Sequence, residues 1–422
     1  MTDFIKLEED LNSIKYKDVG IGSLLALEFG FLHKEAYQTK VLKSYLVFIK
    51  IVFRAFLNKT PIFPNNIILY YKSGDKNHHN QIYSPFQNMK ETVILVGGTK
   101  DAIISSSVFN ISIKNLKDIV KWIFSNYQKF KTILNKNLIN KNELSLFLDL
   151  IINLLRLNFW NDFFQKNKVK TLIGDYDRGN ASVPLFLVSN KYNIRSLVIQ
   201  HGVINPPYGY TPLIADIVFV WGTMQKRQFL ELGVVENRIS ITGTPIVSKI
   251  KKNTTEKQKI KKNIVLAVNP IKTEYIKQQI DAFGQLSLEN EYNLYIKIHP
   301  SQTSKNIEKL VDNKSITILP KNIEFPNFVQ MCDVLVTHNS GLANECILND
   351  VPVIILNNLP IVAGNGLELH KYCNVPLVHN AEELNGQLKN IDTVSISKKN
   401  LYYKTGQEAK VEIQKEALNF IN

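Results

Sequence analysis

The segment VLVTHNSGLANECILNDVPVIIL, residues 334–356, contains a strand, a turn, a helix and a second strand in succession. Its two ends are short runs of valine, leucine and isoleucine, which is typical of strands buried on both faces. A polar turn with a glycine follows the first run, and a helix is expected to begin near Ser340. Two strands joined by one helix run parallel in the same sheet. The segment therefore predicts a parallel α/β sheet.

The same alternation of strand and helix extends over most of the chain. Residues 246–262 interrupt it with a polar, basic stretch that lacks aromatic residues, as is typical of a linker. We therefore predict an α/β protein with two Rossmann-like, doubly wound parallel-sheet domains, 1–245 and 263–405, that face a cleft. Residues 406–422 are predicted to form a helix, and packing back on the first domain is one option for it. The expected strands are 65–71, 91–97, 169–175, 195–200, 214–222 and 239–243, then 263–269, 292–300, 315–320, 333–339 and 352–357.

Length and composition agree with two domains. The chain has 422 residues, about twice the size of an ordinary domain, and 45% of them are hydrophobic. Its three cysteines, Cys332, Cys346 and Cys373, fit neither a disulfide framework nor a metal-ligand spacing, which favours a reducing compartment. The first residues lack a signal-peptide pattern, and no apolar run approaches the roughly 18 residues that span a bilayer. We expect a cytoplasmic protein, either soluble or peripheral at the inner face of the membrane.

The chain is basic, with 51 lysines and arginines against 37 acids and a formal net charge of +14. Such a balance favours anionic partners, although lysine is abundant throughout and general lysine usage is an alternative explanation. No zinc-finger, aromatic RNA-binding or helix-turn-helix pattern is present, so we expect no nucleic acid partner. The segment KSYLVFIKIVFRAFLNK, residues 43–59, is either a core helix with charges at its rim or an amphipathic helix on an anionic membrane surface.

Polar residues stand at the ends of the predicted strands, where open parallel sheets bind ligands. In YIKIHPSQ, residues 295–302, Lys297 and His299 share one side of the strand because side chains alternate, and Pro300 ends it. A lysine and a histidine on one side would suit a diphosphate or a sugar acid. A partly buried histidine with its hydrogen bonds satisfied is the alternative.

The turn of the opening segment forms a candidate anion site. The free N–H groups at a helix N-terminus, together with the positive end of the helix dipole, attract anions. Ser340 can add a hydroxyl donor, and Gly341 permits a ligand to approach closely beside Asn339. Glu345 lies just over one turn further, where its carboxylate could accept two ribose hydroxyls. An ordinary N-cap with an exposed glutamate is the alternative.

In the first domain, IGDYDRGN places Asp175 and Asp177 directly after a predicted strand. Either carboxylate could act as a general base toward an acceptor hydroxyl, a role worth about 10²- to 10⁴-fold in rate. Two neighbouring carboxylates also suit a metal, but no third ligand follows at a suitable spacing, so no metal is expected. Neutralisation of one of them by Arg178 is a simpler alternative.

The next predicted strand ends in the segment SLVIQHGVINPPYGY, which contains His201. A core histidine would not need the glycine that follows it, so we expect His201 to face the cleft as a base or as a positioning residue. The glycine would let a donor or acceptor approach the backbone, and a tyrosine could stack on a sugar. The other residues expected in this part of the cleft are Gln200, Gly202, Tyr208 and Tyr210.

A histidine pair, His78 and His79, follows the strand that begins the first sheet. Adjacent histidines point to opposite sides of an extended chain, and no zinc motif accompanies them. An active-site or acceptor loop is one interpretation of this segment, and a solvated loop is the other. Thr244, in the sequence GTP, stands at the junction of the two domains.

Together these motifs resemble the GT-B glycosyltransferases of bacterial capsule and surface-polysaccharide synthesis. The matching elements are VIQHG and ITGTP in the first domain, and KIHP and NSGLANECILNDVPVII in the second. Polysialyltransferases and CDP-glycerol polymerases carry a similar His-Pro pair and serine-containing turn, and UDP-N-acetylglucosamine 2-epimerases share the architecture. The chain departs from the polysialyltransferases in having NSG in place of a serine run, and from the epimerases in the spacing of its glutamate. The resemblance covers about residues 165–360.

The resemblance implies transfer of a sugar from a CMP- or UDP-activated donor to a glycan or lipid-linked glycan, such as a capsule, O-antigen or lipooligosaccharide precursor, without a metal or other cofactor. A nucleotide-sugar 2-epimerase or a polyol-phosphate transferase on the same fold remains an alternative, as does a non-catalytic nucleotide- or glycan-binding partner. Carried onto this chain, the donor would contact Thr244, Lys297, His299, Pro300, Asn339, Ser340, Gly341 and Glu345, and catalysis would involve Asp175, Asp177 and His201.

Overall fold

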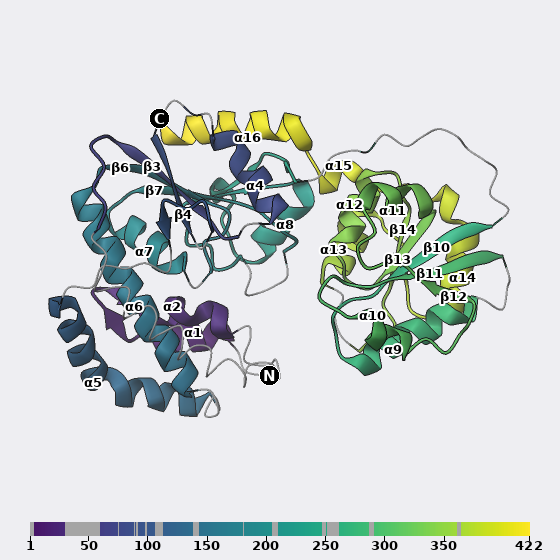
Figure 1. Ribbon diagram of the computed structural model, residues 1–422, viewed down its shortest axis with the longest axis horizontal. Coiled ribbons are helices and arrows are strands. Elements are labelled where there is room, and N and C mark those ends of the chain that lie inside the picture. Colours follow the sequence, from purple (N-terminus) through teal and green to yellow (C-terminus); the bar gives the residue numbers. More distant parts are fainter. Residues whose placement is uncertain are drawn as a thin grey trace.

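The computed structural model of the chain has two α/β lobes side by side (Figure 1). The predictions made for residues 43–59 and for Tyr208 lie outside the residues that it describes. None of the described helices is both long and apolar enough to cross a membrane. The described residues are 4–29, 60–74, 76–87, 89, 92–97, 99–105, 113–137, 143–179, 181–204, 210–246, 250, 261–286, 291–360 and 364–422.

The first lobe is built on a seven-stranded sheet in which all neighbouring strands are parallel. Its strand order is β5-β4-β3-β6-β7-β8-β9, so the chain starts in the middle and reverses direction between β3 and β6. This is the doubly wound topology that the sequence predicts. The strands are β3 (Ile67–Lys72), β4 (Thr92–Gly97), β5 (Ile104–Ser105), β6 (Val169–Gly174), β7 (Arg195–Ile199), β8 (Ile217–Val220) and β9 (Ile239–Ile241).

The second lobe repeats this plan with six parallel strands in the order β12-β11-β10-β13-β14-β15. Here the reversal lies between β10 and β13. The strands are β10 (Lys262–Ala267), β11 (Tyr292–Lys297), β12 (Ile316–Ile318), β13 (Val334–Thr337), β14 (Val353–Leu356) and β15 (Leu377–Val378), and the helices between them are α9 (Thr273–Gly284), α10 (Ser304–Glu308), α11 (Phe325–Met331), α12 (Leu342–Leu348), α13 (Gly364–Cys373) and α14 (Ala381–Lys389).

Both faces of the first sheet are buried because apolar side chains continue along each central strand. In β3, Ile67, Leu69 and Tyr71 face one core, whereas Ile68 and Tyr70 face another. This division follows the two-residue period of a strand. A run without polar alternation is therefore what a sheet covered by helices on both sides requires.

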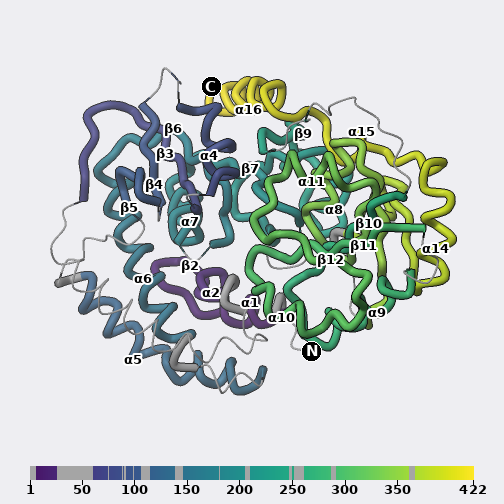
Figure 2. Tube along the Cα trace, turned by 45° about the vertical axis from the view of Figure 1, so that its right-hand side comes forward, coloured from purple at the N-terminus to yellow at the C-terminus, as the bar shows by residue number. Residues whose placement is uncertain are grey.

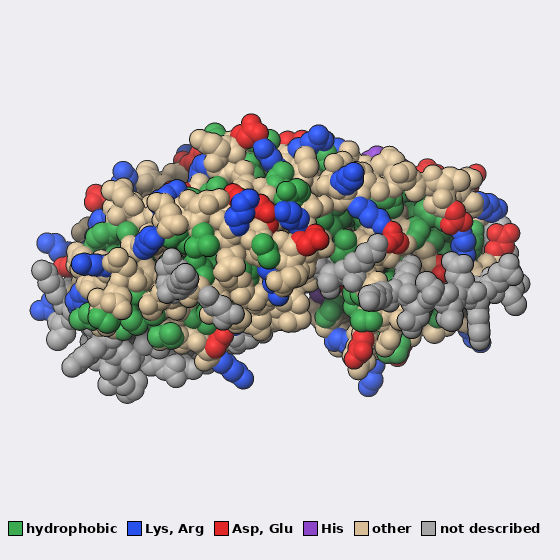
Figure 3. All heavy atoms as spheres, turned by 90° about the horizontal axis from the view of Figure 1, so that it is seen from above, with side chains coloured by type: hydrophobic (Ala, Val, Ile, Leu, Met, Phe, Trp, Pro, Cys, Tyr) green, Lys and Arg blue, Asp and Glu red, His purple; other side chains and the backbone are tan. Residues whose placement is uncertain are grey.

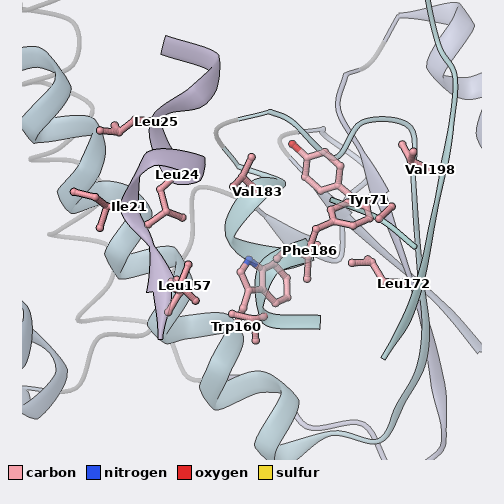
Figure 4. Packing of buried hydrophobic residues seen from close by; sticks show 14 of the residues in the cluster. Ile21, Leu24, Leu25, Tyr71, Leu157, Trp160, Leu172, Val183, Phe186 and Val198 are labelled. Atoms are coloured by element: carbon pink, nitrogen blue, oxygen red, sulfur yellow. The ribbon is translucent and has the colours of Figure 1, made fainter. Parts of the chain in front are cut away.

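Helices of the N-terminal region cover one face of this sheet. They include α1 (Phe4–Asn12), α2 (Ile21–Phe29), α5 (Ile113–Lys136), α6 (Glu143–Lys166) and α7 (Val183–Lys191), with a short β1–β2 hairpin (Lys15–Tyr16, Val19–Gly20) between the first two. Figure 4 shows Leu157 and Trp160 of α6 between side chains of α2 and α7, and Trp160 is 2% exposed. These helices therefore share one core with the sheet.

The chain crosses back to the first lobe at its C-terminal end. The helix α16 (Gly406–Ile421) lies along the top of that lobe in Figures 1 and 2. Its residues Ile413, Ala417 and Ile421 are buried in the core that contains Tyr70. An isolated parallel bridge joins Thr244, near the point where the chain leaves the first lobe, to Thr405, near the point where it returns.

An apolar contact also holds the lobes together near this crossing. Trp221 and Met224, at the start of α8 (Thr223–Glu231), belong to the same buried cluster as Leu401 at the end of α15 (Lys398–Leu401). A side chain at Gly222 would place its Cβ 2.6 Å from the Leu401 carbonyl oxygen, so only glycine allows this close approach. The junction is thus a packed interface.

Candidate functional site

Each of the two sheets has one candidate ligand site. Ligands of open α/β sheets bind beyond the carboxyl ends of the strands, where the strand order reverses. In the first lobe this position lies beyond β3 and β6, and in the second lobe beyond β10 and β13. We call these the first-lobe edge and the second-lobe edge. Most of the site residues predicted from the sequence fall at one or the other.

The second-lobe edge opens into a cavity of about 390 Å³. That volume is in the range of small-molecule sites in proteins. Six of the residues predicted to bind a donor line it together with neighbours that the sequence did not single out. The lining comprises Ala267, Val268, Lys297, Ile298, His299, Pro300, Ile323, Phe325, Ser340, Gly341, Leu342 and Glu345.

Lys297 and Glu345 are the opposite charges of this cavity. Burial lowers the pKa of Lys297, while the nearby side chains of Cys346 and Glu345 act in the other direction. Burial raises the pKa of Glu345, and Lys297 lowers it. Lys297 Nζ also lies 5.7 Å from the centroid of the Phe328 ring. The described residues offer Lys297 no hydrogen-bonded carboxylate, so its ammonium group remains available to an anionic ligand.

His299 stands at the mouth of the same cavity, held by its own turn. Its Nδ1 lies 2.8 Å from Ser301 Oγ, and its backbone N–H donates to Gln302 Oε1 at 3.0 Å. Burial lowers the pKa of His299, and the positive charges of Lys297, Lys76 and Lys321 lower it further. The electrostatic field at His299 is therefore positive, and of these three cations Lys297 lines the cavity itself.

The turn after β13 differs in part from its predicted role. The helix α12 has only seven residues, and its first N–H groups are already used: Leu342 N donates to Ser340 Oγ at 3.2 Å, and Ala343 N to the Ser340 carbonyl at 3.2 Å. Fewer free N–H groups are therefore available to an anion than the sequence indicated. Asn339 is held by the loop that follows β10, because its N–H donates to Asn269 Oδ1 at 3.1 Å. Positive side chains supply most of the charge here.

At the first-lobe edge, Asp175 and His79 form a pair. Asp175 Oδ2 lies 2.7 Å from His79 Nδ1, and the carboxylate also accepts the Ser73 N–H at 2.9 and 3.1 Å. Asp175 has no exposed surface and His79 is 7% exposed. Because β3 and β6 are neighbours, the residues that follow them meet here. His79 comes from α4 (Asn77–Tyr83), which begins shortly after β3.

His201 faces the same edge from the end of β7. Its Nδ1 lies 2.6 Å from the Asp175 carbonyl oxygen, and its ring centroid lies 5.6 Å from that of His79 and 6.4 Å from that of His78. Burial lowers the pKa of His201, against the opposing effect of Asp175. The structure therefore gathers three imidazoles from two distant segments of the chain.

Two described residues beside His201, Tyr210 and Gln200, are buried and hold its turn. Tyr210 is 4% exposed, and its hydroxyl accepts the N–H groups of His201 at 3.2 Å and Gly202 at 2.9 Å. Gln200 has no exposed surface; its Nε2 donates to the Gly202 carbonyl at 2.8 Å and its Oε1 accepts the Trp221 N–H at 3.3 Å. We therefore assign Tyr210 and Gln200 to holding the backbone, in place of the stacking and cleft roles predicted for them.

Two further predicted residues are not brought to either edge. Asp177 has no exposed surface, and its Oδ2 accepts the N–H groups of Ile214 at 2.7 Å and Ala215 at 3.0 Å. Thr244 also has no exposed surface, and its Oγ1 accepts the Ile246 N–H at 3.3 Å in the lobe junction. Both side chains are occupied in holding the fold, so we leave them out of the proposed site.

The two edges lie across from each other. A Cβ built on Gly341, in the second-lobe cavity, would lie 3.8 Å from Val203 Cγ1, two residues after His201. Lys76, which precedes α4, lowers the pKa of both His78 and His299, so its charge reaches both edges. Figure 3 shows the surface indented between the two lobes. A ligand in the cavity would thus approach the imidazoles.

Sequence reasoning missed several residues of the site. Ser73 acts through its backbone N–H, which no side-chain pattern reveals, and Phe325 lines the cavity from α11 without any motif. Gly74 comes shortly after a predicted strand, which is a common place for a functional glycine. Its contact with His79, however, could be found only from the three-dimensional structure. Within the described ranges, no three histidine, cysteine or carboxylate side chains are arranged to hold a metal ion.

Comparison with solved structures defines the class of the fold. No family model matches the chain, and a search of curated proteins finds no match. By structure the chain is similar to UDP-GlcNAc 2-epimerase from Methanocaldococcus jannaschii (TM-score 0.52, 14% identity, 84% of this chain and 100% of that one) and to MurG of Acinetobacter baumannii (0.52, 13%, 84% and 100%). UDP-N-acetylglucosamine 2-epimerase from Rickettsia bellii is similar to the same degree (0.51, 13%, 84% and 97%).

These likenesses, at 13–14% identity, concern architecture alone. Together with the two parallel sheets, they show that the protein has the GT-B fold predicted from its sequence. The capsule-type subclass stays a prediction.

Proposed function

We propose that the protein is a glycosyltransferase that moves a sugar from a CMP- or UDP-activated donor to a precursor of a cell-surface glycan. In this proposal the second lobe holds the nucleotide, and the first-lobe edge receives the acceptor hydroxyl. Transfer is proposed to need no metal, because cationic side chains neutralise the leaving phosphate.

One observation carries the proposal. A cavity with an available lysine, a histidine and a half-buried carboxylate lies beside a cluster of three imidazoles, and the turns that follow β7 and β13 come close at Val203 and Gly341. The cavity has the groups that bind an anionic nucleotide, and the cluster has the groups that move a proton. A pure binding module would need only the first.

Within the cavity we assign roles by charge. Lys297 and His299 would contact the phosphates, with Ser340 and Gly341 beside them. Glu345 would accept ribose hydroxyls, since a carboxylate can only accept hydrogen bonds. Phe325 and Pro300 would pack against the rest of the nucleotide.

The proposal includes a peripheral contact with an anionic membrane surface, where a lipid-linked acceptor would be found. The net charge of +14 supports it, as does the outer face of α5. On that face Phe124 is 81% exposed and Val120 is 43% exposed, with Lys117 and Lys121 exposed beside them. An apolar tip among cations is the composition expected of such a contact. Co-sedimentation with phosphatidylglycerol vesicles but not with phosphatidylcholine vesicles is the expected result.

The nucleotide part of the proposal is tested by thermal shift with UDP, CMP, CDP and GDP. A ligand stabilises the folded state by RT ln(1 + [L]/Kd), so one base should raise the Tm more than the others. The shift should be clearly smaller in Lys297→Met and unchanged in Lys305→Met, an exposed lysine of α10. Equal shifts for all four nucleotides would reject recognition of the base, and no shift with any of them would reject nucleotide binding.

The reaction is tested by incubating UDP- and CMP-sugars with and without glycan acceptors and identifying the products by mass spectrometry and NMR. Glycosyl transfer requires both substrates and yields a longer glycan. An inverted sugar formed without acceptor would instead identify an epimerase. Tight nucleotide binding without turnover of any donor and acceptor pair would identify a binding partner.

A further inference from the structure

The three imidazoles of the first-lobe edge are not equivalent. The rings of His78 and His79 lie 3.9 Å apart between centroids, and those of His79 and His201 lie 5.6 Å apart. His79 alone among them has a carboxylate at its ring, at 2.7 Å from Asp175. His201 makes its contact to the backbone carbonyl of Asp175, a neutral group.

Asp175 is placed to act through His79 and not on a ligand. The carboxylate has no exposed surface, and its oxygens are contacted by the Ser73 N–H and the His79 ring. A group enclosed in this way cannot touch an acceptor. It can hold the imidazole in one orientation and stabilise the positive charge that forms when the ring takes a proton.

The contact with Asp175 also determines the tautomer of His79. An ionised carboxylate only accepts hydrogen bonds, so His79 Nδ1 carries the proton that it donates to Asp175. The lone pair then resides on Nε2, to which the described residues donate no hydrogen bond. An unprotonated ring nitrogen held by a carboxylate on the other side is the arrangement of a general base.

Gly74 keeps this ring edge accessible. A Cβ at residue 74 would lie 3.0 Å from both Nε2 and Cδ2 of His79, closer than side chains normally pack. Any other residue would press on the nitrogen that must receive the proton. A glycine beside the Nε2 edge is an observation independent of the hydrogen bond on the opposite side of the ring.

The neighbouring histidines are suited to a neutral state. Burial lowers the pKa of His78 to about 4, helped by the charges of His79, His201 and Lys76 and opposed by Asp175. Burial likewise lowers the pKa of His201. Neutral imidazoles of this kind can orient a hydroxyl by hydrogen bonding without competing for its proton.

From this geometry we propose that His79 is the general base that deprotonates the acceptor hydroxyl and that Asp175 is its positioning residue. This inference rests on the proposed glycosyl transfer and deepens it. His79 Nε2 takes the hydroxyl proton while the hydroxyl oxygen forms a bond to the anomeric carbon. The bond from that carbon to the phosphate oxygen breaks, and its electron pair leaves with the nucleotide. The imidazolium formed on His79 is paired with Asp175 and later returns the proton to water.

The test combines turnover with chemical rescue. In His79→Ala, kcat should fall by about 10²- to 10⁴-fold while the Kd of the stabilising nucleotide stays within about twofold, because the nucleotide cavity is on the other lobe. Added imidazole should restore part of the kcat in His79→Ala and none in Asp175→Ala, where the base is present but unheld. His379→Ala, an exposed histidine of the second lobe, is the matched control. A loss of kcat below tenfold, or no rescue by imidazole, overturns the inference and leaves glycosyl transfer standing.

A measurement on the resting protein tests the geometry without turnover. Long-range ¹H–¹⁵N NMR of the histidine rings should show His79 protonated on Nδ1 only, with that signal changed by Asp175→Asn. Protonation on Nε2 overturns the assignment whatever the activity. If wild-type protein transfers no sugar from any donor, the proposed function fails and this inference fails with it.

Discussion

The edges of the two sheets are alike in topology and unlike in chemistry. Each lies where a parallel sheet reverses its strand order, yet the first-lobe edge holds groups bonded to one another and the second-lobe edge holds groups facing a cavity. His79 and Asp175 are paired at 2.7 Å, whereas Lys297 has no such carboxylate partner among the described residues. The comparison teaches that the same position of the fold can hold either a buried hydrogen-bonded pair or charged groups that face a cavity.

Burial explains the difference. Asp175 is enclosed and can be ionised only with partners that compensate its lost hydration, so its surroundings are fixed before a ligand arrives. Lys297 and Glu345 are half-buried and both line the cavity, so a ligand could reach them. The first edge is therefore held together by contacts within the protein, whereas the second edge leaves charged groups open to a cavity.

The largest expected effect would separate the edges by function. Asp175→Asn should lower kcat by about 10²- to 10⁴-fold, because the His79 ring loses its charged partner, while nucleotide affinity changes by less than about twofold. Asp177→Asn should act mainly on the Tm, since Asp177 accepts two backbone N–H groups and faces no ligand. If both variants lost nucleotide affinity to the same extent, the two edges would not have separate functions.

The next effect concerns the second edge alone. Lys297→Met should weaken binding of the stabilising nucleotide by about 10- to 100-fold, the loss expected for one hydrogen bond to a charged group. Isothermal titration calorimetry measures it, with Lys305→Met as the exposed control. An unchanged Kd would show that the cavity beside Lys297 is not the phosphate site.

A smaller effect would locate the ribose. Glu345→Gln should weaken nucleotide binding by about 3- to 10-fold, since an amide accepts hydrogen bonds less strongly than a carboxylate. The 2′,3′-dideoxynucleotide, which lacks both ribose hydroxyls, should bind wild type and variant with the same affinity, because the contact is absent in both. Glu308→Gln is the matched control on α10. If Glu345→Gln weakened binding of the ribo and dideoxy forms equally, Glu345 would not contact the ribose.

The smallest expected effect is on stability at mild acid. Burial holds the pKa of His78 at about 4, below its unfolded value of about 6.5, so between these values the unfolded chain binds more protons. Stability is therefore expected to fall as the pH drops from about 6.5 toward 4. His78→Asn should flatten this pH dependence of the Tm by a degree or so, because solvent reaches part of the ring. If the dependence of the Tm on pH did not change, protonation of His78 would not destabilise the folded state.

The sequence predicted the fold well because burial on both faces leaves its mark on every central strand. Apolar runs such as that of β13, each followed by a polar turn and a helix, specified parallel strands, and the structure has them in two sheets. Strand ends supplied the candidate residues, since the edge of a parallel sheet is where ligands bind. Lys297, His299 and Glu345 line the cavity as that reasoning expected.

Side-chain direction and pairing could not be predicted in the same way. Asp175 and Asp177 are two residues apart with similar surroundings in sequence, yet one meets His79 and the other meets the backbone of residues 214 and 215. The partner of Asp175 lies 96 positions earlier in the chain. Only the adjacency of β3 and β6 brings the two together.

By itself, the sequence determined that two parallel sheets form and that polar residues stand at their carboxyl ends, because hydrophobic periodicity and turn residues act locally along the chain. The tertiary structure alone decided which of those polar residues are enclosed, which face a cavity and which nitrogen of His79 is free. These properties depend on contacts between segments far apart in sequence, and burial sets the free energy of every charge among them.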